Sequence, residues 1–297
     1  MSKLLIWFKE TRPHFLLLTP VTVLVGISTL MHDKVGIDIV DLSLVLIGAL
    51  LAHISVNVLN DYFDYKSGID LKTRRTPFSG GSGILVSGLL DPLKVKMLGL
   101  LSIATGLVIA AYFYFKVGWL ILLIALVGAG LIYFYTDYLT KVGLAEVAAG
   151  LGFALMALGS YYALSGSISE TITYSSLVVF FTVANLLLLN EFPDVNADKA
   201  AGRRHLPILL GRKKASYVYV IFEALSYLTI LRIAFSYGFL ALMPLLSIPL
   251  AIRSSRGAIR YYDDINKLVP YLGENVRLVF SKLLLLSISL GLSSLLY

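Results

Sequence analysis

Cysteine is absent from this chain of 297 residues, which excludes disulfide bonds, thiol nucleophiles and cysteine-ligated metals. Charged residues are scarce: Asp, Glu, Lys and Arg make up 14%, against roughly 25% in soluble domains. Hydrophobic residues instead reach 58%, and the mean hydropathy is +0.83. We therefore expect lipid to surround most of the chain. The net charge of +7 is weak evidence for a nucleic-acid partner, and we expect none, because in a membrane protein the location of charges matters more than their sum.

Nine apolar segments are long enough to cross the roughly 30 Å of hydrocarbon in a bilayer. They cover approximately residues 15–31, 42–60, 94–114, 117–135, 143–164, 174–191, 215–232, 236–252 and 277–296. This pattern predicts an all-α, polytopic membrane protein with about nine transmembrane helices. We expect one domain over residues 1–297, with long loops at about 61–93 and 192–214 and a short helix or ordered loop over 253–274. The charged N-terminal segment is expected at the membrane interface.

Lys and Arg alternate between the two sides of the predicted spans, and cytoplasmic loops of membrane proteins carry the excess. Of the 25 Lys and Arg, 21 fall in the N-terminal segment and in the loops that follow the even-numbered spans. The other four are Lys34, Lys116, Arg232 and Lys282. This asymmetry predicts a multi-pass protein of the cell membrane with a cytoplasmic N-terminus and an external C-terminus.

A first acidic motif, NDYFDYKSGID, directly follows the apolar run of the second span. Asn60 and Asp64 are four residues apart and share one helical face. Gly68 is a natural end for this helix, and a turn there would bring Asp70 back toward that face. With Asp61, three or four oxygen ligands are expected to converge.

A second motif, NEFPDVNAD, ends the sixth span. Asn190, Asp194 and Asp198 recur every four residues and would line one stripe if the helix continued through Pro193, which predicts a kink. Oxygen donors without His or Cys suit Mg²⁺, whose coordination is usually completed by waters and substrate phosphates. Because clustered carboxylates beside apolar spans are costly without a bound cation, we interpret the two motifs as a trap for Mg²⁺ and a diphosphate.

Basic residues accompany both motifs. Lys66, Arg74 and Arg75 precede a glycine-rich stretch at 80–83, and Arg203 follows the second motif. The functional interpretation is contact with phosphate by cations and exposed backbone amides. The alternative is cytoplasmic positive charge beside a flexible turn.

An aromatic cluster with Tyr133 and Tyr135 ends the fourth span, with Lys141 nearby. Such a cluster is ordinarily an interfacial belt, but it also suits cation–π stabilisation of an allylic cation, which we favour. Among the histidines, we expect His53 to be a satisfied core residue and His205 to lie at the interface.

The two motifs together, NDYFDYKSGID followed by TPFSGGSG and N-x-x-x-D-x-x-x-D followed by KAAGRRHLPILLG, resemble the UbiA superfamily of intramembrane aromatic prenyltransferases over essentially the whole chain. The first motif, with Gly68 and then Asp70, is similar to the branch that prenylates dihydroxynaphthoate for menaquinone. The second motif departs from that branch, because Pro193 stands where an Arg is common.

The resemblance implies a helical bundle around a central cavity and a Mg²⁺-dependent transfer of a prenyl group from an isoprenyl diphosphate to a lipophilic, aromatic acceptor through an allylic carbocation. The implied metal ligands are Asn60, Asp61, Asp64, Asp70, Asn190, Asp194 and Asp198. The residues expected in catalysis are Asp64, Asp194, Tyr135 and Lys141, and those expected to bind substrate are Lys66, Arg74, Arg75, Tyr133 and Arg203.

Two alternatives stay open. The first is that the acceptor is a non-aromatic compound such as a glycerol phosphate lipid. The second is that the chain is a cation transporter with a site lined by carboxylates, and such a site is expected near the middle of the bilayer. Phosphatidyltransferases require a D-x-x-D-G-x-x-A-R motif that the sequence lacks. The sequence gives no indication of an oligomeric state.

Overall fold

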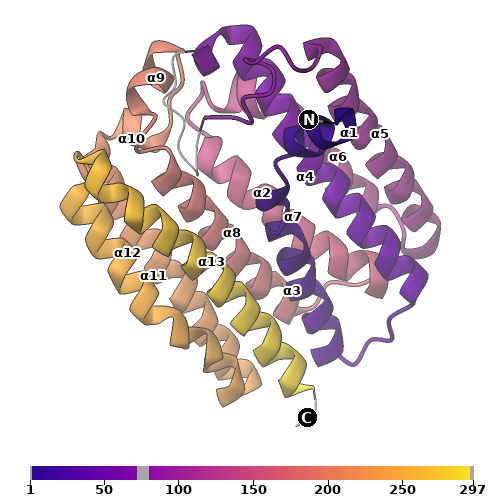
Figure 1. The fold of residues 1–297 in the computed structure, drawn as a ribbon. Helices are drawn as coiled ribbons and strands as arrows, with labels where there is room; N and C mark the ends of the chain where they lie inside the picture. The colour runs from indigo at the N-terminus through magenta and orange to yellow at the C-terminus, as the bar shows by residue number, and fades with distance from the viewer. Residues whose placement is uncertain (1, 72–79, 295–297) are drawn as a thin grey trace.

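The computed structural model describes residues 2–71 and 80–294, most of which form helices (Figure 1). The helices are α1 (Lys3–Glu10), α2 (Pro13–Leu16), α3 (Leu18–His32), α4 (Ile39–Ser67), η1 (Ile69–Leu71), α5 (Pro92–Val117), α6 (Leu120–Phe134), η2 (Tyr135–Leu139), α7 (Ala145–Ser165), α8 (Glu170–Asn190), α9 (Val195–Ala200), α10 (Leu206–Leu209), α11 (Arg212–Tyr237), η3 (Phe239–Ser247), α12 (Ile248–Tyr261) and α13 (Ile265–Ser293).

Local signals explain where the long helices begin. The Asp38 carboxylate accepts hydrogen bonds from the backbone N–H groups of Val40 and Asp41 and so caps α4. Asp91 caps α5 in the same way, with proline at the first helical position, where its missing N–H costs nothing. Ser169 caps α8 through the N–H of Ile172. Polar caps therefore separate the apolar runs into distinct helices.

Within the described residues, nine helical segments are long and apolar enough to cross a membrane, which confirms the predicted fold class and number. The last two segments differ from the prediction. Residues 253–274 form neither a separate short helix nor a loop, because α12 continues to Tyr261 and α13 starts at Ile265. Ser254, Gly257 and Ala258 are buried while the arginines of this stretch are exposed, so the second half of α12 is amphipathic and a search for apolar runs misses it.

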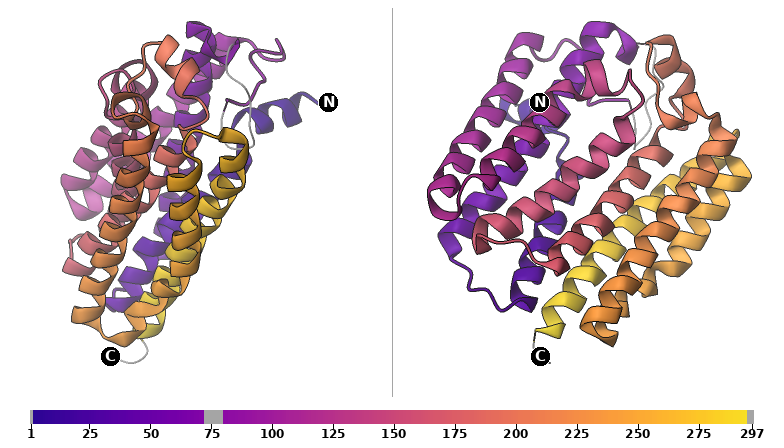
Figure 2. Two further views of the ribbon diagram at one scale, coloured as in Figure 1. Left: turned by 90° about the vertical axis from the view of Figure 1, so that its left-hand side faces the viewer. Right: turned by 180° about the vertical axis from the view of Figure 1, so that it is seen from behind.

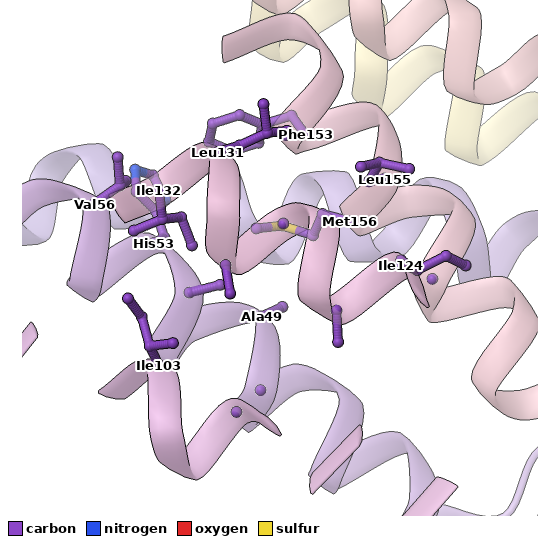
Figure 3. A pocket seen from close by; sticks show the side chains of 18 of the residues that line it. Ala49, His53, Val56, Ile103, Ile124, Leu131, Ile132, Phe153, Leu155 and Met156 are labelled. Carbon is purple, nitrogen blue, oxygen red and sulfur yellow. The ribbon is translucent and has the colours of Figure 1, made fainter. Parts of the chain in front are cut away.

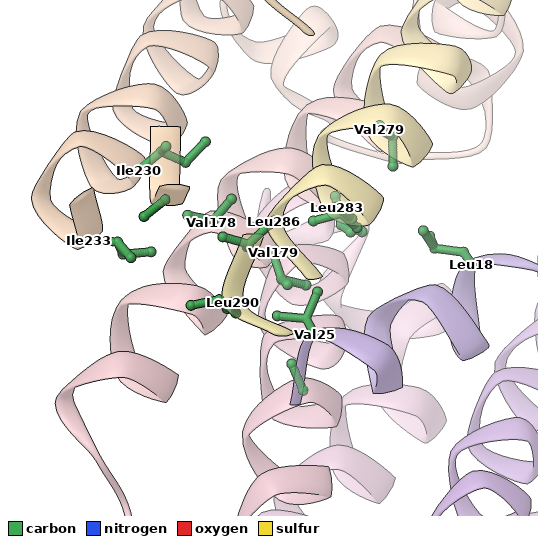
Figure 4. Packing of buried hydrophobic residues seen from close by; sticks show 13 residues of the cluster. Leu18, Val25, Val178, Val179, Ile230, Ile233, Val279, Leu283, Leu286 and Leu290 are labelled. Carbon is green, nitrogen blue, oxygen red and sulfur yellow. The ribbon is translucent and has the colours of Figure 1, made fainter. Parts of the chain in front are cut away.

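The helices pack in two groups that share α3, α7 and α8. A cluster of buried aliphatic residues joins α3, α7, α8, α11 and α13 (Figure 4). A second cluster, with Phe113 and Tyr161, joins α3, α7 and α8 to α4, α5 and α6. α7 packs against α3, α6 and α8. A Cβ at Gly150 of α7 would lie 2.6 Å from the carbonyl oxygen of Phe180, so glycine allows α7 and α8 to approach closely.

The two acidic motifs lie at one end of the bundle, which we call the motif end, and the C-terminal end of α13 lies at the other (Figure 1). The N-terminal helix α1 projects sideways at the motif end (Figure 2, left). Its Leu4 and Phe8 side chains are 82% and 57% exposed, whereas its last residue, Glu10, is fully buried. One face of α1 is thus free to contact lipid while its end reaches the motif region.

Candidate functional site

The first motif is the last two turns of α4 and the turn that follows. Gly68 adopts a left-handed φ of 75°, ends the helix and allows the single turn η1 to bring Asp70 back, as the sequence predicts. Asp61, Asp64 and Asp70 are all buried. Three carboxylates thus gather in an interior environment, which requires compensating positive charge or hydrogen bonds.

The glycine-rich segment packs over this motif. The Ser82 N–H donates to Asp61 Oδ2 at 2.8 Å, and the Ser82 hydroxyl donates to Glu10 Oε2 at 2.7 Å. Gly81 has a φ of +69°, and a Cβ there would lie 3.1 Å from Asp70 Oδ2. The glycine is therefore needed both for its backbone conformation and for close approach to a carboxylate.

The second motif does not form the single stripe that the four-residue spacing would give in a continuous helix. α8 ends at Asn190, a turn follows, and the short α9 begins at Val195. Pro193 lies within this turn, where its missing N–H breaks the helix rather than only kinking it. Asn190, Asp194 and Asp198 nevertheless all line one cavity, which we call the motif cavity.

Arg203 joins the two motifs. Its guanidinium donates a 2.9 Å hydrogen bond to Asp198 Oδ1 and a second, short one to Asp64 Oδ1. All three side chains are largely buried. The structure therefore brings the ends of α4 and α9 face to face, with a cation between two carboxylates that are 134 residues apart in sequence (198 − 64).

Two adjacent cavities that share several lining residues lie at and below the motifs. The motif cavity, about 370 Å³, is lined by residues of both motifs together with Gly80 and Gly81. An apolar cavity of about 380 Å³ lies between α4, α5, α6 and α7 (Figure 3). Asn60, Tyr135 and His53 are among the residues that line both. A ligand with a polar head and an apolar tail would span them.

The apolar cavity is deep. On α4 it is lined from Asn60 to Leu44, and this separation of 16 residues (60 − 44) corresponds to roughly 24 Å at 1.5 Å per residue. On α7 it extends from Ala148 to Ala163. Most of its wall is aliphatic, aromatic or glycine, with few polar groups. Such a cavity suits a long hydrocarbon chain and excludes water.

The other predicted site residues lie in different places. Tyr135 lines both cavities. Lys66, Tyr133 and Lys141 are exposed, and none belongs to the described lining of either cavity. Lys141 instead pairs with Asp137 at 3.7 Å. Their predicted roles gain no support from these positions. Arg74 and Arg75 lie outside the described residues.

The sequence did not indicate that Glu10 and Arg12 belong to this region. Burial, followed by the nearby Asp61 carboxylate, raises the pKa of Glu10 to about 8. Arg12 lines both cavities and lies 3.7 Å from Asp61 Oδ1. No spacing links these residues to the first motif, so only the fold reveals the contact.

His205 is a correction to the sequence analysis, because it is buried rather than interfacial, with 1% of its surface exposed. Its Nε2 lies 3.4 Å from Glu191 Oε2 and 3.8 Å from Asp198 Oδ2. Burial lowers the pKa of His205 to about 4. Burial and the adjacent Asp198 carboxylate raise the pKa of Glu191 well above its ordinary value. The motif cavity therefore has a histidine and a further acid in its wall.

Comparison with known proteins agrees with this architecture. The chain is 26% identical over 272 residues to a 1,4-dihydroxy-2-naphthoate octaprenyltransferase of Bacillus subtilis, covering 89% of this chain and 85% of that protein. It is 28% identical over 260 residues to UbiA prenyltransferase domain-containing protein 1 of Dictyostelium discoideum, covering 84% and 77%.

Solved structures share the fold at lower identity. A UbiA homolog from Archaeoglobus fulgidus bound to DMAPP and Mg²⁺ matches with a TM-score of 0.65 and 16% identity over 95% of this chain and 99% of that one. A digeranylgeranylglyceryl phosphate synthase matches with a TM-score of 0.64 and 19% identity over the full length of both chains. The model of the UbiA prenyltransferase family matches residues 19–272. This chain therefore belongs to the UbiA prenyltransferase family and is an integral membrane prenyltransferase.

Proposed function

We propose that this enzyme transfers a prenyl group from an isoprenyl diphosphate to a lipophilic aromatic acceptor, with Mg²⁺ as cofactor. The observation that carries the proposal is the pairing of two oxygen-rich motifs across Arg203 at the mouth of a deep apolar cavity. A prenyl diphosphate has the matching form, an anionic head on a hydrocarbon tail. The whole chain, residues 1–297, would act as one prenyltransferase domain.

The donor set fits Mg²⁺. The residues that would hold it are Asn60, Asp61, Asp64, Asp70, Asn190, Asp194 and Asp198, all of which offer oxygen. The Asn190 side-chain oxygen is buried without a hydrogen-bond partner among the described residues, as expected for a group that awaits a cation. Bound Mg²⁺ would neutralise the diphosphate and make it a better leaving group. The A. fulgidus neighbour of the same fold is bound to DMAPP and Mg²⁺, which supports the choice of ion and donor class.

The chain's own residues have three tasks in this mechanism. Arg203 provides fixed positive charge between the motifs, where negative charge develops on the leaving diphosphate. The apolar cavity holds the tail and keeps water from the allylic cation, which water would otherwise capture. Tyr135, at the junction of the cavities, presents an aromatic ring that stabilises the cation.

An acceptor of the dihydroxynaphthoate type is the one we favour. The support is the first motif, with Gly68 and Asp70, and the similarity to the B. subtilis dihydroxynaphthoate octaprenyltransferase. The digeranylgeranylglyceryl phosphate synthase is similar at 19% identity, which bears on the fold alone and does not decide between the acceptors. A mid-membrane cation transporter is disfavoured, because the carboxylates among the described cavity residues all lie at the motif end.

We further propose that the motif end faces the cytoplasm of a cell-membrane protein, with the C-terminus outside. The support is the excess of Lys and Arg in the segments at that end. A cysteine introduced at exposed Lys141, in this otherwise cysteine-free chain, should not react with a membrane-impermeant thiol reagent in intact cells. Labelling of that cysteine before the cells are lysed would indicate the opposite orientation.

The acceptor is tested by incubating the purified enzyme with a prenyl diphosphate, Mg²⁺ and a panel of acceptors, followed by mass spectrometry. The panel includes dihydroxynaphthoate, 4-hydroxybenzoate and a glycerol phosphate lipid. We expect a prenylated aromatic product. Product from the glycerol phosphate alone would overturn the aromatic assignment while leaving the prenyltransferase assignment intact.

A further inference from the structure

Three side chains around the second motif meet at the wall of the motif cavity. Glu191 follows α8, Asp198 belongs to α9 and His205 precedes α10. One ligand atom from each lies within 4.8 Å of the other two. His205 and Asp198 are 1% and 2% exposed. The group thus combines two carboxylates with one buried imidazole.

The two separations from His205 Nε2 exceed those of ordinary hydrogen bonds and suit ligands of a common ion. His205 Nε2 lies 3.4 Å from Glu191 Oε2 and 3.8 Å from Asp198 Oδ2, whereas N–H···O bonds measure about 2.7–3.2 Å. Two ligands that each bind a tetrahedral metal at about 2.0–2.1 Å lie roughly 3.4 Å apart. Neither His205 ring nitrogen has a hydrogen-bond partner in the described part of the chain, although buried polar atoms nearly always have one.

The backbone on both sides of His205 is fixed. The Leu206 N–H donates to Glu146 Oε1 at 2.7 Å, and the Arg204 N–H donates to the Thr140 carbonyl oxygen at 2.7 Å. Asp198 uses Oδ1 for its hydrogen bond with Arg203, which leaves Oδ2 toward His205. The ligand atoms are therefore held in position before an ion arrives.

We propose that Glu191, Asp198 and His205 form a site for a divalent transition-metal ion such as Mn²⁺, Co²⁺ or Zn²⁺, beside the all-oxygen ligands assigned to Mg²⁺. An imidazole nitrogen favours these ions, whereas Mg²⁺ prefers oxygen. The site shares only Asp198 with the proposed function and does not depend on prenyl transfer. It would retain a transition metal in the presence of excess Mg²⁺.

The test uses full-length protein in detergent, without a polyhistidine tag, titrated with Co²⁺ in excess Mg²⁺ and followed by the visible absorption of the ion. We expect the wild type to bind a single Co²⁺ per chain with the spectrum of a nitrogen-containing site. His205→Gln should weaken this binding about tenfold or more. The matched control is His32→Gln, since the His32 ring lies at the opposite end and bonds to Ser293 Oγ at 2.6 Å.

A second variant, Glu191→Gln, keeps the side-chain size and removes the charged ligand, so it should also weaken Co²⁺ binding. Unchanged Co²⁺ affinity and spectrum in both variants would overturn the site. Circular dichroism and the thermal midpoint establish that each variant is folded. Mg²⁺-dependent binding of a prenyl diphosphate is measured on the same samples. Co²⁺ binding that requires His205 without any donor binding would support the metal site and overturn the proposed function.

Discussion

Arg203 lies between Asp64 and Asp198 and donates a hydrogen bond to each carboxylate. Asp64 belongs to α4 and Asp198 to α9, so this one guanidinium connects elements from distant parts of the chain. The planar guanidinium has donors spread in a fixed fork and can therefore serve two carboxylates at once, which the single ammonium of a lysine does less well. The contact sets the distance between the two oxygen clusters.

Replacing Arg203 with alanine should destabilise the metal-free protein by about 3–5 kcal/mol, because two buried carboxylates lose their cation. Mg²⁺ should restore much of the loss, since it supplies positive charge to the same clusters. The stability of Arg203→Lys should lie between that of the wild type and that of Arg203→Ala. Thermal unfolding in EDTA and in Mg²⁺ measures both effects. An equal loss of stability under the two conditions would show that the clusters do not bind the ion.

Gly128→Leu should narrow the apolar cavity without a clash, because Gly128 lines the cavity and nothing lies within 4 Å of the Cβ position. We expect activity with long donors to fall about tenfold or more relative to a short donor. The matched control is Gly130→Leu on the same helix, which has equal space at Cβ and lies outside the described lining. The same donor preference in both variants would mean that the cavity does not hold the tail.

Glu10 should make the stability of the metal-free protein depend on pH. Its pKa is 4.5 without the folded environment and about 8 within it, so the folded state retains a proton that the unfolded state loses. Stability should therefore fall as pH rises from about 4.5 to about 8. Glu10→Gln cannot ionise, yet its amide oxygen still accepts from Ser82. In EDTA, the thermal midpoint of Glu10→Gln should change less with pH than that of the wild type. An equal dependence on pH in the two proteins would refute this account of Glu10.

Glu223 and Lys282 form a buried ion pair between α11 and α13. The Asn185 side chain also donates a hydrogen bond to Glu223 Oε2 at 3.1 Å. Lys282→Met alone should cost about 3–5 kcal/mol, because it leaves a carboxylate unpaired in the bundle. Adding Glu223→Leu should recover most of that loss. Unfolding of the two variants in mixed micelles measures the difference. A double variant no more stable than the single one would argue against a simple ion pair.

The sequence was sufficient for features with local causes. Apolar runs, caps and the Gly68 turn depend on neighbouring residues, so the number of spans and the return of Asp70 were predictable. Pro193 was predicted to kink a helix, whereas a turn separates α8 from α9. The α12–α13 region was missed because its arginines mask an amphipathic pattern.

Contacts between distant segments were not predictable from one sequence. Ser82 bonds to Glu10 across 72 residues, and Arg203 to Asp64 across 139. No spacing or composition signals such pairs, since they depend on how whole helices pack. His205 illustrates the same limit. The residue precedes a short helix at the end of a basic stretch, and its burial depends on distant segments, such as α7, whose Glu146 accepts a hydrogen bond from the Leu206 N–H.

The most direct test of the central claim is prenyl transfer by wild type, Asp64→Asn and Asp198→Asn enzymes, each assayed with Mg²⁺ and with EDTA, together with release of diphosphate. These substitutions keep side-chain size and remove the charge that would hold the cation. We predict that wild type with Mg²⁺ forms prenylated product and releases diphosphate in equal amounts, whereas EDTA or either substitution lowers the rate by about 10²-fold or more. Undiminished transfer in EDTA, or in both variants, would contradict the account.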